Sequence, residues 1–117
     1  MNTAKPTLRS LFMLAAAATM AAIAAPSLAA DIDAGLKLAT ERCAACHGKD
    51  GNTPIDPSYP RLSGQYQEYL AHSLRAYKQD QRKNAIMGAQ AKLLSRDDIL
   101  NLAAYYASLP GVMSHQR

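Results

Sequence analysis

The sequence predicts a small all-α domain, and three observations lead to that prediction. Leu and Ala dominate after residue 30, whereas the strand formers there are one Val, four Ile and two Thr. Three segments repeat apolar residues at helical spacing. The only Phe, Phe12, lies near the N-terminus and there is no Trp, so the core is thin. We therefore expect a non-protein group to fill part of the interior.

The first two predicted helices flank a long irregular segment. Residues 33–46 carry an apolar stripe, formed by Ile32, Leu36, Ala39 and Cys43. Residues 64–79 form the second helix, with Ser63 expected as its N-cap. Its apolar face carries Tyr66, Tyr69, Leu70, Ser73, Leu74 and Tyr77, and His72 falls on the opposite, polar face. Residues 48–62 contain two Gly and three Pro, so an ordered loop is expected there.

The third predicted helix has the clearest limits. Ser95 and Asp98 approximate a capping box before residues 96–109, and Pro110 follows the last apolar position. Residues 80–94, which contain Met87, are expected to form a second irregular connection.

The N-terminal segment is typical of a secretory signal peptide. Lys5 and Arg9 precede an apolar run over residues 11–25, and Ser27-Leu28-Ala29 is a small-x-small cleavage site. The run is short and rich in alanine for a spanning helix, although an uncleaved anchor is the alternative. We therefore expect a signal peptide over residues 1–29, one exported domain over residues 30–117, a periplasmic location and no stable membrane insertion after cleavage.

Removal of that leader changes the charge. The net charge falls from +4 to +2 because two basic residues and no acidic ones leave with it, so nucleic-acid binding is not expected. Basic residues gather around the Met87 segment, at Lys78, Arg82, Lys83, Lys92 and Arg96, against Asp80, Asp97 and Asp98. They form either a solvated face or a positive rim that steers an acidic partner.

The chemistry lies in Cys43-Ala44-Ala45-Cys46-His47. Cys-x-x-Cys-His in an exported chain is the attachment sequence of c-type haem. Two cysteines three apart present both sulfurs to one edge of the porphyrin, and His47 then lies beneath the ring. A structural zinc site needs four ligands, a disulfide across this spacing closes a tiny loop, and a thioredoxin-like pair needs a βαβ unit. Haem is the interpretation that fits best.

The second axial ligand of the iron has four candidates. Met113 and His115 follow the Pro110 stop, in a tail expected to fray. His72 is expected to face solvent. Met87 lies in a connection long enough to return across the ring, and its alternative role is that of a core methionine. We expect Met87 to ligate, and His/Met ligation leaves no open position for a substrate.

The chain resembles bacterial class I cytochromes c, of the branch with short mono-haem carriers and the halves of di-haem proteins. The resemblance rests on CAACHGKDGN from Cys43, YPRLSGQ from Tyr59, the Ile86-Met87-Gly88 loop and LSRDDILNLAAYYASL from Leu94. It implies three main helices and loops wrapped around one covalent haem c. A cytochrome c prime is disfavoured, because its attachment motif lies near the C-terminus of a four-helix bundle.

The resemblance also implies roles for individual residues. Cys43 and Cys46 would form thioethers, with His47 the proximal and Met87 the distal iron ligand. The Pro60 carbonyl would accept a hydrogen bond from His47 Nδ1. Arg61 and Gln65 would lie near the haem propionates. The first and last helices would cross at Gly35, against Tyr105 or Tyr106.

Three functions follow as hypotheses. The first is a carrier that shuttles single electrons between a membrane oxidoreductase and a terminal oxidase or reductase, without being an enzyme itself. The second is a haem c subunit of a periplasmic dehydrogenase complex. The third is a thiol redox protein without haem.

Overall fold

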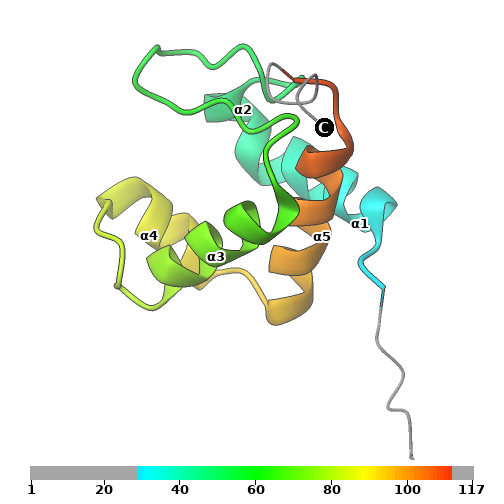
Figure 1. Cartoon of the computed structure of the whole chain (residues 1–117). Helices are drawn as coiled ribbons and strands as arrows, with labels where there is room; N and C mark the ends of the chain where they lie inside the picture. The colour runs from blue at the N-terminus through cyan, green and yellow to red at the C-terminus, as the bar shows by residue number, and fades with distance from the viewer. Residues whose placement is uncertain (1–28, 112–117) are drawn as a thin grey trace, which may run out of the picture.

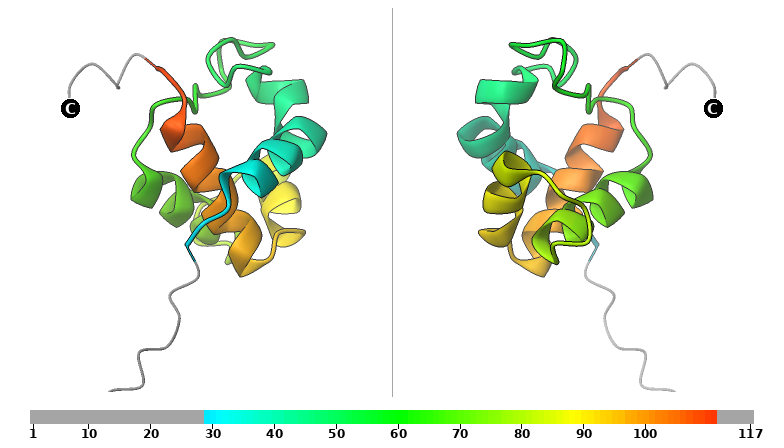
Figure 2. Two further views of the ribbon diagram at one scale, coloured as in Figure 1. Left: turned by 90° about the vertical axis from the view of Figure 1, so that its right-hand side faces the viewer. Right: turned by 90° about the vertical axis from the view of Figure 1, so that its left-hand side faces the viewer.

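The computed structural model describes residues 29–111, which are helical and contain no strand. The expectation of an all-α fold is therefore confirmed for this part of the chain. Figure 1 shows α5 running through the centre, with α1 crossing it on one side and α3 and α4 on the other. The loop between α2 and α3 arches over one end of the molecule in both views of Figure 2.

The first helical run covers residues 32–47, within one residue of the expected limits at each end. It is made of α1 (Ile32–Leu38), a π-helical segment η2 (Ala39–Cys43) and α2 (Ala44–His47). Asp31 caps its start, because the Asp31 carboxylate accepts from the N–H of Ala34 at 3.0 Å. The π turn was not expected, and it ends at the first cysteine of the attachment motif. Such turns often occur at functional sites.

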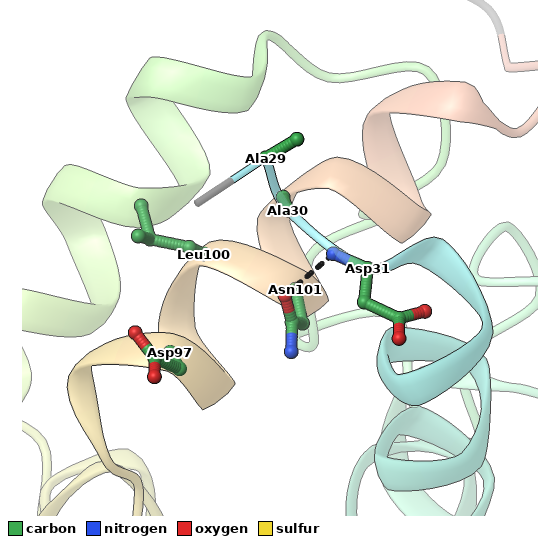
Figure 3. A pocket seen from close by; sticks show the side chains of 6 residues that line it. All are labelled: Ala29, Ala30, Asp31, Asp97, Leu100 and Asn101. Atoms are coloured by element: carbon green, nitrogen blue, oxygen red, sulfur yellow. Dashed lines mark hydrogen bonds between the residues drawn. The ribbon is translucent and has the colours of Figure 1, made fainter. Parts of the chain in front are cut away.

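The segment before α1 is fastened to α5. Figure 3 shows the N–H of Asp31 donating to Oδ1 of Asn101, at 2.8 Å. A small pocket of about 160 Å³ lies beside this bond, lined by Ala29, Ala30, Asp97 and Leu100 as well. The beginning of the described chain therefore has a fixed place on the last helix.

Gly35 is where α1 and α5 cross, as expected. A Cβ atom added at Gly35 would lie 2.2 Å from the carbonyl oxygen of Asn101 and 2.8 Å from Cβ of Tyr105. Only glycine allows the two backbones to approach this closely. The crossing fixes the direction in which the first helical run leads to the cysteines.

The loop before α3 corrects one prediction. Ser63 does not cap a helix: it is buried, and its hydroxyl donates to the carbonyl oxygen of Asp50. Gly64 has a positive φ of 73°, which ends any helix through this position. α3 (Gln67–Lys78) therefore begins three residues later than expected, with Tyr66 at its N-cap and no side-chain hydrogen bond there.

The connection expected to be irregular contains a helix, α4 (Ala85–Lys92), so that expectation was wrong. The helix is short, and Ile86 in its first turn is 52% exposed. It shows no apolar stripe that periodicity could detect. Its limits come instead from polar contacts: Asn84 caps its start, and Lys78 Nζ donates to the carbonyl oxygens of Lys92 and Leu94 at its end.

The last helix, α5 (Arg96–Ser108), has the predicted capping box. Ser95 Oγ accepts from the N–H of Asp98 at 3.1 Å, and the Asp98 carboxylate accepts from the N–H of Ser95 at 2.7 Å. The buried core gathers around this helix and consists of Ala39, Leu70, Ala71, Leu94, Ile99, Leu102, Ala103, Tyr105 and Tyr106. It contains few large side chains, as the composition predicted.

Candidate haem-binding site

A cavity of about 690 Å³ opens beside this core, a size in the usual range for small-molecule and cofactor pockets. The first helical run contributes Cys43, Cys46 and His47 to its lining, and α4 contributes Met87. Seven aliphatic side chains also line it, namely Leu62, Leu70, Leu74, Ile86, Leu94, Leu102 and Ala103. The two motifs singled out in the sequence therefore meet at one cavity.

His47 is the most buried of the candidate ligands, with 5% of its surface exposed. Its Nδ1 lies 2.9 Å from the carbonyl oxygen of Pro60. A carbonyl can only accept, so Nδ1 carries the proton and Nε2 keeps its lone pair for a metal. The Tyr59 ring meets the imidazole edge-on, with centroids 6.1 Å apart. The sequence resemblance implied this Pro60 contact, and the structure contains it.

Cys43 and Cys46 are half-buried and form no disulfide. Burial raises the pKa of the Cys43 thiol, and a hydrogen bond with Tyr106 opposes the rise only in part. A raised pKa keeps the sulfur neutral, which is the reverse of what a thiol redox protein needs in its attacking cysteine. An apolar environment does suit a neutral thioether. Within residues 29–111, no three His, Cys, Asp or Glu side chains gather as a metal cluster.

Met87 is half-buried in the first turn of α4 and lines the cavity. His72, a competing candidate, is exposed on α3 and is absent from the lining of that cavity. The other two candidates, Met113 and His115, lie outside the described residues. Of the candidates for the second ligand that the structure describes, Met87 is the one that lines the same cavity as His47.

Arg61 and Gln65 also line the cavity. Arg61 is exposed, whereas the side chain of Gln65 accepts from the N–H of Tyr66 at 2.8 Å. Their contact with haem propionates stays a prediction.

Two lining residues were missed by sequence reasoning. Tyr106 was expected on the last helix as a candidate for the crossing with Gly35, yet it also lines the cavity, and burial raises its pKa. Asn84 lies three residues before Met87, a spacing that could have indicated an N-cap.

Fewer of the basic residues around α4 are available to contact a partner than their number in the sequence suggested. Lys78 is half-buried and caps α4, and Lys92 pairs with Asp80 at 3.1 Å. Arg82 lines the cavity and lies over the Tyr77 ring, 4.8 Å from its centroid. Lys83 and Arg96 are exposed. Of these five residues Arg82 lines the cavity and Lys83 is its exposed neighbour in the chain, and the exposed Arg42 and Arg61 add positive charge to the lining from elsewhere.

These features define a class of protein: a small all-α domain built around one cavity that fits a haem. The fit rests on the cavity volume, on the free Nε2 of His47 and on the neutral cysteine beside it. The family profile of cytochrome c matches residues 32–110. The chain belongs to the cytochrome c family and carries haem c, attached through Cys43 and Cys46.

Individual relatives agree with this assignment. Cytochrome c-554(548) of Halomonas halodenitrificans is 48% identical over 69 residues, which are 56% of this chain and 82% of the relative. Cytochrome c4 of Thiocapsa roseopersicina is 42% identical over 74% of this chain and 44% of its own length. A thiosulfate dehydrogenase electron acceptor of Thiomonas intermedia is 43% identical over 57% of this chain and 31% of its own. The chain thus spans less than half the length of the last two.

Proposed function

We propose that this protein is a periplasmic carrier of single electrons, with His47 and Met87 as the axial ligands of one haem c. The observation that carries the proposal is that both side chains line one cavity from separate elements, α2 and α4. Haem c supplies a one-electron Fe(III)/Fe(II) couple when bound. His47 and Met87 would occupy both axial positions and leave none for a substrate, which favours electron transfer over catalysis.

The remaining residues of the site support the same role. The Pro60 carbonyl fixes the His47 ring, and such outer contacts orient a ligand and raise its basicity. Apolar side chains form a large part of the lining, and an apolar surrounding together with a thioether ligand favours a high potential. Arg61 and Gln65 line the same cavity and would meet the propionates.

A second candidate function is that of a haem c subunit in a periplasmic dehydrogenase complex. It is favoured by relatives from Thiomonas intermedia and Stutzerimonas stutzeri that are named thiosulfate dehydrogenase electron acceptors. A free carrier should elute from a sizing column as a small red protein. A subunit should co-elute with a dehydrogenase. In either case we propose an oxidoreductase, a terminal oxidase or reductase, or a dehydrogenase as the redox partner.

The proposed location rests on the N-terminal segment. Residues 1–29 have the pattern of a signal peptide, and residues 1–28 lie outside the described structure. Among the described residues, no helix is long and apolar enough to cross a membrane. Mass spectrometry of the exported protein should give an N-terminus at Ala30 or Asp31 plus one haem. An intact Met1 on a membrane-bound product would contradict the proposed processing.

The ligand assignment is tested by Met87→Ala. This variant should keep its covalent haem, because Cys43, Cys46 and His47 remain. It should lose the weak far-red sulfur-to-iron band of the ferric protein, and its potential should fall, because a ligand that favours Fe(II) is gone. The control variants His72→Ala and Met113→Ala should keep the band. Loss of the band in either control, with retention in Met87→Ala, would overturn the assignment.

A further inference from the structure

The helix that carries Met87 begins with a side-chain cap on Met87 itself. Asn84 has an extended backbone, and its Oδ1 accepts from the N–H of Met87 at 2.9 Å. The first N–H groups of a helix have no partner within it. In α4, Gly88 is the first residue whose N–H reaches back along the helix, to the Asn84 carbonyl at 2.8 Å. The Asn84 side chain therefore supplies the hydrogen bond that the Met87 backbone would otherwise lack.

Little else holds this first turn. Ala85 and Ile86 are exposed, the latter by 52%. A helix of eight residues is not stable by itself, so it depends on caps and packing. Apart from the cavity that Ile86 and Met87 line, the start of α4 is exposed, and the cap is the hydrogen bond that fixes the Met87 backbone there.

The rest of α4 is held by different contacts. Gly88 and Ala91 are buried. Lys78 Nζ donates to the carbonyl oxygen of Lys92 at 3.2 Å and also to that of Leu94, which satisfies the C-terminal end of the helix. Loss of the Asn84 cap should therefore loosen the first turn alone and leave the remainder of α4 in place.

We propose that Asn84 is a positioning residue for the Met87 thioether, and that its side chain determines how often Met87 withdraws from the iron. The proposal rests on the proposed function, in which Met87 is the axial ligand. A soft thioether binds Fe(III) less firmly than Fe(II), so the effect belongs mainly to the ferric protein. The sulfur keeps its lone pair when it withdraws, and the step needs no other reactant.

The test measures imidazole binding to the ferric protein, at imidazole concentrations where withdrawal of Met87 limits the rate. Asn84→Ala should raise that rate by about five-fold, which corresponds to the loss of a cap of about 1 kcal/mol. Asn84→Ser keeps a neutral oxygen acceptor at the N-cap and should restore the original rate. Ser95→Ala is the matched control, because it removes the same kind of cap from α5 and because Ser95 does not line the cavity. It should lower the stability of the protein without changing imidazole binding.

Three results would overturn the inference. One is an unchanged rate in Asn84→Ala, and another is an equal rise in Ser95→Ala, which would indicate a loss of global stability. The third result is a hydrogen-exchange measurement on the wild-type ferrous protein, so it does not depend on the folding of any variant. There the amide of Met87 should exchange with solvent more slowly than that of Ile86, and equal exchange would contradict the cap. Retention of the far-red band in Met87→Ala would instead defeat the proposed function.

Discussion

At the scale of single residues, the two ring nitrogens of His47 have different tasks in the proposed site. Nδ1 is fixed by the Pro60 carbonyl, and Nε2 would bind the iron. The identities of Cys43, Cys46 and His47 could be predicted from the sequence, because their spacing along the chain states the chemistry directly. The partners of these residues could not be derived in the same way. Tyr106 reaches Cys43 through tertiary packing, which helical periodicity does not describe.

Asp50 gives a prediction about pH at this scale. Its Oδ1 accepts from the N–H groups of Asn52 and Thr53 at 2.9 and 2.8 Å, and its Oδ2 from the Thr53 hydroxyl at 2.8 Å. These bonds, that from Asn52 foremost, lower the pKa of Asp50 below its ordinary value of 3.8. The folded state thus favours the charged carboxylate. Its contribution to stability is complete above the unfolded pKa and is lost as the pH falls through the lower folded pKa.

The corresponding measurement compares wild type with Asp50→Asn in urea unfolding at several pH values. The difference in free energy of unfolding should be constant above about pH 5 and should shrink on acidification below about pH 4. A difference that is independent of pH down to pH 2 would contradict the role of the carboxylate charge.

At the scale of secondary structure, the elements with strong local signals were predictable. The last helix was predicted to within one residue, because Ser95, Asp98 and Pro110 mark its ends. The helix α4 was missed for two reasons. Its ends are stabilised by hydrogen bonds from the side chains of Asn84 and Lys78, and its sequence shows no apolar stripe at helical spacing. The π turn at Ala39–Cys43 was missed too. One turn of wider spacing leaves an apolar stripe almost unchanged.

The close approach of α1 and α5 at Gly35 predicts that two Gly→Ala substitutions have opposite effects on stability, one at this crossing and one in α4. Gly35→Ala should destabilise the protein by about 1–3 kcal/mol, because the new Cβ would overlap the Asn101 carbonyl oxygen. Gly88→Ala is the matched change in α4, where the nearest atom to a new Cβ is the Tyr77 carbonyl oxygen at 4.0 Å. It should stabilise the protein by up to about 1 kcal/mol, since Ala favours a helix over Gly. Both are measured by thermal or urea unfolding of the haem-containing protein. Equal effects would contradict the close approach at Gly35.

At the scale of the whole molecule, the thin core and the large cavity belong together. Among residues 29–111, Leu102 is the largest side chain that is fully buried, and a cavity of about 690 Å³ lies beside it. The sequence predicted both, because the domain contains no Phe or Trp. Which basic residues remain available to a partner was not predictable. Tertiary contacts occupy Lys78 and Lys92, and they leave Lys83 exposed.

At the scale of the whole molecule, the exposed basic residues give a prediction about the rate of association with a redox partner. If an acidic partner meets the cavity face, association should slow as salt is added, and Lys83→Glu should slow it several-fold at low salt. Lys37→Glu is the control, because it makes the same change of charge on an exposed residue of α1. Stopped-flow electron transfer with the partner measures both. Equal slowing by the two variants would indicate an effect of net charge alone, and no dependence on salt would indicate an apolar dock.

A redox titration of the purified protein, followed by its visible spectrum and by addition of carbon monoxide, tests the central claim most directly. Our account predicts a red protein with one covalent haem that takes up one electron reversibly. It also predicts six-coordinate spectra in both oxidation states and no rapid binding of carbon monoxide to the ferrous form, because His47 and Met87 hold both axial positions. Rapid binding of carbon monoxide by the wild-type protein would show an open position, and would contradict an electron carrier with this pair of ligands.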